Sequence, residues 1–142
     1  MFSTSVRRLG ASLTTYAPPM RVAIVGSGPS GFYAASRILH SFDAQCGTGE
    51  NGVDIHMYER LPTPFGLVRY GVAPDHPEVR NVENKFDEVA RDPRFTFLGN
   101  VQVTGGADVL PSAAVPVPLS CMAPYYTHIL FAYGASDARH LH

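Results

Sequence analysis

Acidic residues are absent from the start of this chain, and cysteine is scarce along all of it. No Asp or Glu precedes Asp43, and the two cysteines are Cys46 and Cys121. They form no C-x-x-C pair, so they indicate two reduced thiols rather than a redox pair or a disulfide framework. The six histidines contain no H-E-x-x-H motif and have no cysteine pair near them, so we expect no metal site.

A strong charge of one sign and long apolar runs are also missing. The formal net charge is −1, which gives no electrostatic reason to expect a nucleic acid as partner. No apolar run approaches the roughly 20 residues that a membrane-spanning helix needs, so we expect no transmembrane segment. The 45% hydrophobic and 16% charged residues in a chain of 142 are typical of a folded protein of one domain or less.

The acid-free N-terminus, residues 1–20, is rich in Ser and Thr and contains Arg7 and Arg8. An amphipathic segment with Arg and without acids is typical of a mitochondrial transit peptide. We therefore predict such a peptide, disordered or helical, over residues 1–20. A disordered tail of chance composition is the alternative, and a secretory signal fits less well because no continuous apolar core is present. Four apolar residues would share one helical face: Phe2, Val6, Leu9 and Leu13.

The most informative stretch is RVAIVGSGPSG, residues 21–31, in which an apolar run breaks into three glycines. It predicts a buried parallel strand, a sharp turn and a helix. The turn needs Gly26, close approach of a pyrophosphate needs Gly28, and tight packing of helix on strand needs Gly31. The helix N-terminus adds unpaired N–H donors and partial positive charge. We predict a dinucleotide site here; a turn that serves packing alone is the alternative.

An alternation of apolar and polar residues over 53–59 predicts a second strand, which ends in the acid Glu59. In a strand–helix–strand unit of this kind the acid accepts hydrogen bonds from the adenosine ribose. The gap from the glycines exceeds the usual ~20 residues, and residues 46–52 look like an inserted loop. Asp54 competes for the role but lies mid-strand. The intervening helix is predicted from apolar residues at helical spacing, namely Phe32, Ala35, Leu39 and Phe42.

Residues 60–80 lack periodicity and are punctuated by Pro and Gly, which predicts a long ordered loop. Its apolar residues suggest packing on a flat hydrophobic partner such as a flavin ring or a second domain. These residues are Phe65, Leu67, Val68, Tyr70 and Val72. Beyond the loop we predict a helix over residues 76–91, strands at 95–98, 101–103 and 127–132, a loop over 104–118 and a helical turn near 119–125.

The chain closely resembles the adrenodoxin reductase family in four stretches, which occur in the order VGSGPSGFYAA, YERLPTPFGLVRYGVAPDHPEVRNV, FLGNVQV and ILFAYGASDAR. These are the mitochondrial NADPH–ferredoxin reductases and their bacterial relatives. The resemblance covers about residues 20–142, and GLVRYGVAPDHP is far more specific than the glycines. It implies an α/β fold: a partial doubly wound, Rossmann-like FAD-binding domain with a parallel sheet.

The resemblance also implies roles for single residues. The glycine turn would hold the FAD pyrophosphate, and Glu59 would bind the adenosine ribose. Leu67 would contact the cofactor, and Val103 matches a position on the adenine side. His76 lies in a stretch that the family places near the flavin, but its role is open. The predicted cofactor-binding residues are Gly26, Ser27, Gly28, Ser30, Gly31, Glu59, Leu67 and Val103.

The chemistry that the resemblance implies is hydride transfer from NADPH to the flavin N5, followed by two single-electron transfers to a [2Fe–2S] ferredoxin of the adrenodoxin type. The protein binds, orients and tunes the flavin. Hydride transfer needs no general base, so we predict no catalytic residue. The predicted presequence and the family resemblance together imply that the protein is located in the mitochondrial matrix or on the matrix face of the inner membrane. In the second case it would associate with the membrane peripherally.

The chain departs from the family in length. Family chains are several times longer, and no second G-x-G-x-x-G follows here. Residues 21–142 therefore match the N-terminal half of the FAD-binding domain, without the NADP domain or the final FAD segment. We expect this polypeptide alone neither to oxidise NADPH nor to hold FAD firmly. The alternatives are a truncated, non-catalytic FAD-domain fragment, an NAD(P)-binding dehydrogenase domain and a reductase subunit of the glutamate-synthase type.

Overall fold

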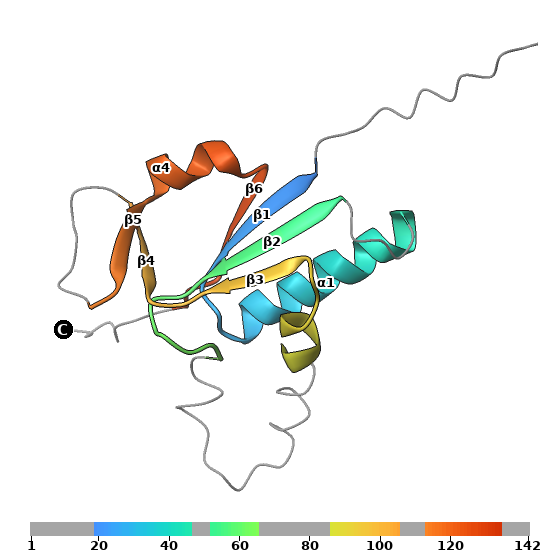
Figure 1. Ribbon diagram of the computed structural model, residues 1–142, viewed down its shortest axis with the longest axis horizontal. Coiled ribbons are helices and arrows are strands. Elements are labelled where there is room, and N and C mark those ends of the chain that lie inside the picture. Colours follow the sequence, from blue (N-terminus) through green and yellow to red (C-terminus); the bar gives the residue numbers. More distant parts are fainter. Residues whose placement is uncertain (1–18, 47–51, 66–85, 106–112, 135–142) are drawn as a thin grey trace, which may run out of the picture.

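The computed structural model describes residues 19–46, 52–65, 86–105 and 113–134 (Figure 1). The predictions for Leu67, for His76 and for nearly all of the transit peptide lie outside these ranges. In the described part of the chain, no helix is long and apolar enough to cross a bilayer. The elements are β1 (Met20–Val25), α1 (Pro29–Cys46), β2 (Val53–Tyr58), β3 (Phe95–Leu98), β4 (Val101–Thr104), β5 (Val115–Pro118), α4 (Leu119–Met122), the 3-10 helix η1 (Ala123–Tyr125) and β6 (His128–Phe131).

The main sheet has four parallel strands in the order β3-β2-β1-β6. β1 lies between β2 and β6, with Val22 opposite both Ile55 and His128. The chain runs outward from β1 to β2 and β3, and then returns to the other side of β1 as β6. This reversal creates a topological switch point at the carboxyl ends of β1 and β6. The predicted α/β fold with a parallel sheet is confirmed.

One face of the sheet is covered by α1 and by a helical segment at residues 86–90 (Figure 1). Phe32 of α1 is 1% exposed and stacks on Phe86, with 4.8 Å between the ring centroids. Both rings belong to one core with the fully buried Ile55 and Met57 of β2. Burial of each such large apolar side chain contributes about 1.5–3 kcal/mol, so this core holds the N-terminal part of α1 against the sheet.

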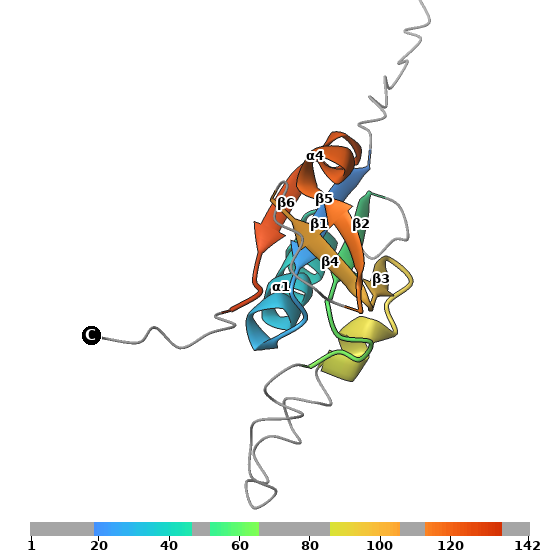
Figure 2. The same cartoon turned by 90° about the vertical axis from the view of Figure 1, so that its left-hand side faces the viewer.

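Tyr126, which directly follows η1, binds to the opposite face of the sheet. Its hydroxyl lies 2.6 Å from the hydroxyl of Tyr58 and 2.7 Å from Nδ1 of His56. These two β2 residues alternate with the buried Ile55 and Met57, so they point to the other side of the strand. The contact anchors α4 and η1 on the side of the sheet away from α1, and the two views in Figures 1 and 2 agree on this arrangement.

β4 and β5 form a separate parallel pair beside the main sheet (Figure 2). The loop predicted over residues 104–118 is therefore wrong at its end, where Val115–Pro118 forms β5. The sequence VPVP discourages a strand because proline has no N–H to donate to a ladder. In β5 the alternate valines supply the donors, and the N–H of Val115 donates to the carbonyl of Asn100 at 2.8 Å. Since β5 has one neighbour in this sheet, only one of its edges needs donors.

Arg94 joins the end of α1 to the turn before β3. Its Nη1 and Nη2 lie 2.6 and 3.2 Å from the carboxylate oxygens of Asp43, and its Nε and Nη2 lie 2.9 and 2.8 Å from those of Asp92. The Arg94 side chain is only 10% exposed. Its hydrogen bonds hold the pKa of both carboxyl groups below the usual range. This planar, multidentate pairing fixes α1 relative to the start of β3.

The remaining predicted elements lie where the sequence placed them. β1 starts at Met20, one residue inside the predicted transit peptide, and β2 stops at Tyr58, just before Glu59. Residues 86–90 are the described part of the helix predicted over 76–91. The predicted inserted loop lies mostly outside the described residues, although Cys46 belongs to α1. The predicted face of α1 is buried at Phe32, Ala35 and Leu39 and partly buried at Phe42.

Candidate dinucleotide-binding site

Gly26 joins β1 to the turn, and both its conformation and its surroundings exclude a side chain. Its φ is +108°, and a Cβ at this position would lie 2.5 Å from the carbonyl oxygen of Ala132 and 2.6 Å from Cα of Tyr133. The N–H of Ala132 in turn donates to the carbonyl of Val25 at 2.7 Å. The chain that leaves β6 therefore runs directly against the turn, and only glycine fits there.

Gly28 faces open space instead. No heavy atom of the described residues lies within 4 Å of the position that its Cβ would take. The helix α1 begins at the next residue, Pro29, and has no acidic residue in its first turn. The first N–H groups of a helix have no partner within the helix, and they carry the positive end of its dipole. This accessible end of α1 has the properties of an anion site.

Gly31 brings the first turn of α1 against the end of β1. A Cβ here would overlap the carbonyl oxygen of Gly26 and would lie 3.4 Å from Cε of Met57. Packing alone therefore accounts for Gly26 and Gly31, whereas it does not account for Gly28. Of the three glycines, Gly28 is the position that leaves room for a ligand.

Glu59 reaches from the end of β2 to the same turn. Its Oε2 accepts hydrogen bonds from the backbone N–H of Ser27 at 2.9 Å and from the Ser27 hydroxyl at 2.7 Å. Its Oε1 accepts a bond from the N–H of Leu61 at 3.0 Å. The N–H of Gly26 donates to the carbonyl of Tyr58 at 2.7 Å, which ties the two strand ends together. The structure thus brings Glu59 and the glycine turn together across 32 positions of sequence.

The two predicted serines differ in their surroundings. Ser27 is fully buried, and its hydroxyl is engaged by Glu59 rather than turned to open space. Ser30, in the first turn of α1, is exposed, and within the described part of the chain its hydroxyl makes one long bond of 3.4 Å, to the carbonyl of Ala132. Ser30 is therefore the hydroxyl that a ligand at the turn can reach.

The other predicted residues lie further away or outside the described chain. Val103 is half-buried on β4, two residues beyond Val101, whose N–H donates to the carbonyl of Glu59 at 2.8 Å. Leu67 is not among the described residues. Asp54, the competitor for the ribose, points from mid-strand toward Arg21 at 3.8 Å, so it does not reach the turn.

Phe65 belongs to this corner in a way that the sequence did not reveal. Its φ is +83°, its N–H donates to the carbonyl of Ser27 at 3.1 Å, and its ring packs on Phe32 and Phe86 with centroids 5.0 and 5.7 Å away. Phe65 is partly buried and packs on the chain's own core. The other apolar residues of its loop lie outside the described residues, so packing of the loop on a flavin or a second domain stays a prediction. The place of Phe65 between Pro64 and Gly66 was the available signal for a tight turn.

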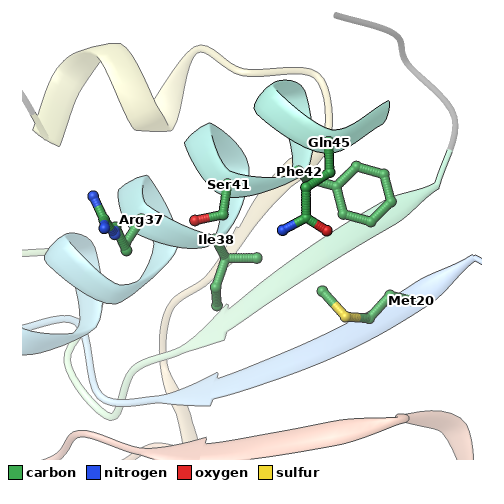
Figure 3. A pocket seen from close by; sticks show the side chains of 6 residues that line it. All are labelled: Met20, Arg37, Ile38, Ser41, Phe42 and Gln45. Carbon is green, nitrogen blue, oxygen red and sulfur yellow. The ribbon is translucent and has the colours of Figure 1, made fainter. Parts of the chain in front are cut away.

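An open hollow of about 340 Å³ lies elsewhere, along the flank of α1 near the start of β1 (Figure 3). Its lining is Met20, Arg37, Ile38, Ser41, Phe42 and Gln45. Met20 is the first residue of β1, so this hollow lies at the amino end of the strand, whereas the glycine turn lies at the carboxyl end. Ligands of open parallel sheets bind at the carboxyl ends of the strands, so the glycine turn remains the candidate site.

Comparison with known proteins finds relatives that are named as NADPH-dependent reductases. No family model matches the chain. The chain is 45% identical over 120 residues to the NADPH-ferredoxin reductase FprA of Mycobacterium leprae, and 46% identical over 120 residues to a probable mitochondrial NADPH:adrenodoxin oxidoreductase of Schizosaccharomyces pombe. These matches cover 84% of this chain, but only 24% and 22% of the two relatives.

A solved structure of Mycobacterium tuberculosis FprA in complex with NADPH aligns with a TM-score of 0.68 at 42% identity. It is matched over 87% of this chain and 24% of its own chain. The fold is therefore shared as well as the sequence. The chain spans about a quarter of the length of the relatives it matches, and over that part it is a homologue of the NADPH-ferredoxin and NADPH:adrenodoxin reductases.

Proposed function

We propose that the chain forms the adenosine-diphosphate end of an FAD site in an oxidoreductase that passes electrons from NADPH to an adrenodoxin-like [2Fe–2S] ferredoxin. The observation that carries the proposal is the open position at Gly28, at the switch point of the sheet, beside a carboxylate held at Glu59. The homologues named for NADPH and ferredoxin or adrenodoxin support the electron donor and acceptor.

The residues present fit this part of FAD. The first N–H groups of α1 and the Ser30 hydroxyl would bind the pyrophosphate beside Gly28, and Glu59 would accept a bond from the adenosine ribose. Val103 would lie on the adenine side, and Leu67 would contact the cofactor. When bound, FAD supplies the exchange between a two-electron hydride and single electrons. The chain's own residues bind and orient it, and none is needed as general acid or base.

The charge of Glu59 favours FAD over NADP at this position. A carboxylate accepts hydrogen bonds from the free ribose hydroxyls of FAD, whereas it repels the 2′-phosphate of NADP. The similar solved structure of FprA is a complex with NADPH. Because Glu59 disfavours a 2′-phosphate at the glycine turn, we place NADPH at a second site in the longer relatives. The glycine turn of this chain would then serve FAD.

Ligand-induced stabilisation tests the assignment. The purified 142-residue polypeptide is mixed separately with FAD, ADP, NAD and NADP, and Tm is followed by thermal shift. A ligand that binds only the folded state raises Tm, so FAD and ADP should raise it more than NADP does. An equal or larger rise with NADP than with FAD and ADP would contradict the FAD site.

Coverage of a quarter of the relatives favours a second proposal about this polypeptide by itself. We infer that the 142 residues alone bind FAD weakly and do not oxidise NADPH. The test is visible flavin absorbance after gel filtration, followed by addition of NADPH. A yellow protein that is bleached by NADPH would refute this second proposal and leave the FAD site itself supported.

For location we propose the mitochondrial matrix or the matrix face of the inner membrane. The Arg-containing, acid-free residues 1–20 support this, as do the mitochondrial names of the relatives from Schizosaccharomyces pombe and Drosophila melanogaster. Fusion of residues 1–20 to a fluorescent protein should direct it into mitochondria. The matched control replaces Arg7 and Arg8 by Gln. A cytosolic signal from the unaltered fusion would contradict the transit peptide.

A further inference from the structure

We propose that Ser27 is a positioning residue that sets the Glu59 carboxylate for the ribose, and that it does not itself bind the cofactor phosphates. The proposal rests on the proposed nucleotide site. It starts from the burial of Ser27, which is 0% exposed although the next three residues of the chain, 28–30, are partly or fully accessible. It also reassigns a residue that the sequence placed among the direct cofactor contacts.

Both hydrogen-bond donors of Ser27 are committed to Glu59. A serine hydroxyl carries one hydrogen, and here it points to Oε2 of Glu59 at 2.7 Å. The backbone N–H of Ser27 points to the same oxygen at 2.9 Å. Neither donor is free for a phosphate. Anion binding at this turn therefore falls to the exposed Ser30 and to the N–H groups of the first helical turn.

The acceptor side is equally specific. A carboxylate offers about four lone-pair sites, and Oε2 of Glu59 receives two bonds from Ser27 while Oε1 receives one from Leu61. The three donors fix the plane of the carboxylate, and the free acceptor capacity is on Oε1. A ribose hydroxyl that approaches Glu59 then meets an acceptor that is already oriented, so less side-chain freedom is lost on binding.

The hydroxyl of Ser27 is not needed to join β1 to β2. The strands are paired along their whole length, and the N–H of Gly26 also bonds to the carbonyl of Tyr58. The carbonyl of Ser27 is held by the N–H of Phe65 through the backbone. Replacement of Ser27 by alanine therefore keeps these backbone links, and it removes one of the two bonds that orient Oε2.

The test compares ADP with 2′,3′-dideoxy-ADP on the full 142-residue chain, with dissociation constants from NMR titration. Their ratio measures ribose recognition separately from phosphate binding. We expect wild type to prefer ADP by about tenfold, as for hydrogen bonds to a charged group. Ser27→Ala should lower the preference to about threefold or less with unchanged binding of dideoxy-ADP. Ser41→Ala, on the far part of α1, is the matched control and should keep the wild-type ratio.

Glu59→Ala and the double variant Ser27→Ala/Glu59→Ala complete a mutant cycle. If Ser27 acts through Glu59, its removal has no further effect on the ligand ratio once Glu59 is gone. A wild-type chain that does not distinguish the two ligands would overturn both the ribose site and the role of Ser27. A wild-type preference that survives Ser27→Ala, or an equal loss of both ligands, would overturn only the role of Ser27.

One measurement needs no ligand and no altered serine. The amide of Ser27 should be slow to exchange in wild type and should exchange faster in Glu59→Ala, because its acceptor is lost. Equal exchange rates in the two proteins would show that the Ser27–Glu59 contact is not formed in solution, and the proposal would fail there.

Discussion

Gly26 and Ala132 approach so closely that a single Cβ on the glycine would lie 2.5 Å from the alanine carbonyl oxygen. The contact joins the first strand of the sheet to the chain that leaves the last described strand, across the switch point. It makes Gly26 a requirement of the fold, whereas a Cβ on Gly28, two residues later, would meet no described heavy atom within 4 Å. Substitution of Gly26 should therefore affect the stability of the fold, and substitution of Gly28 should affect ligand binding.

Gly26→Ala should destabilise the folded chain. The backbone has a φ of +108°, and a side chain in such a conformation costs about 1–3 kcal/mol before any overlap is counted. The overlap with Ala132 and Tyr133 adds to this cost. Urea unfolding followed by circular dichroism should show a clearly lower midpoint, or no cooperative transition. A midpoint equal to that of wild type would mean that the turn differs from the structure described.

Gly28→Ala is the matched variant, with the opposite expectation. Since no described heavy atom lies within 4 Å of the new methyl group, the free energy of unfolding should change by less than about 1 kcal/mol. Binding of FAD or ADP should weaken by about tenfold or more, because the methyl blocks the close approach of the pyrophosphate to the backbone. Titration of both nucleotides measures this. Unchanged affinity would remove the ligand role of Gly28.

Sequence alone located the glycine turn, the acid and the strands around them because each depends on a local pattern. Gly26, Gly28 and Gly31 occur at a fixed spacing, and Glu59 ends a clear alternation. That pattern could not separate glycines required by packing from the one that faces open space. For Gly26 the distinction depends on the carbonyl of Ala132, more than a hundred positions away in the chain, and for Gly31 on the carbonyl of Gly26 and on Met57.

What the sequence missed depends on three-dimensional partners. The partner of the Ser27 hydroxyl is a carboxylate 32 positions away, so spacing within the motif suggests a phosphate contact instead. The strand with the sequence VPVP could not be predicted because proline has no N–H to donate to a β-ladder. Its pairing with β4 in the structure shows that the valines supply the donors. The apolar character of Phe65 was visible, but its packing partners were not.

Arg94→Met should lower stability and weaken its dependence on acid. Hydrogen bonds from Arg94 lower the pKa of Asp43 and Asp92 from 3.8 in the folded chain. A carboxyl group with a lowered folded pKa stabilises the fold above its unfolded pKa, and this contribution is lost as pH falls through the folded value. Wild-type Tm should therefore drop below about pH 4, and the drop should be shallower in Arg94→Met.

Arg91→Met is the control for this variant. Arg91 lies on the exposed surface and approaches Asp87 at only 4.0 Å, with 77% of its side chain exposed, and such surface pairs contribute little. Its Tm profile should follow that of wild type across the acid range. If Arg94→Met also follows wild type, the partly buried ion pairs of Arg94 with Asp43 and Asp92 do not contribute to the acid response.

Tyr126→Phe should act at the alkaline end of the pH range. The hydroxyl of Tyr126 bonds to Tyr58 and His56 on the face of the sheet away from α1. Burial, reinforced by the bond with Tyr58, raises the pKa of Tyr126 above its ordinary value of 10.0. A group whose folded pKa is raised stabilises the fold below its unfolded pKa, and the contribution is lost as pH rises beyond it. Wild-type stability should therefore fall above pH 10.

In Tyr126→Phe the free energy of unfolding at neutral pH should fall by about 1 kcal/mol, the usual net value of a hydrogen bond. The further fall above pH 10 should be smaller than in wild type, because Phe has no proton to lose. Urea unfolding at pH 7 and at alkaline pH measures both effects. Tyr125→Phe is the control, since Tyr125 is 68% exposed and its variant should keep the wild-type response. An alkaline fall of equal size in Tyr126→Phe would assign it to another group. Unchanged stability at pH 7 would show that the contact of Tyr126 with Tyr58 and His56 does not anchor η1 to the sheet.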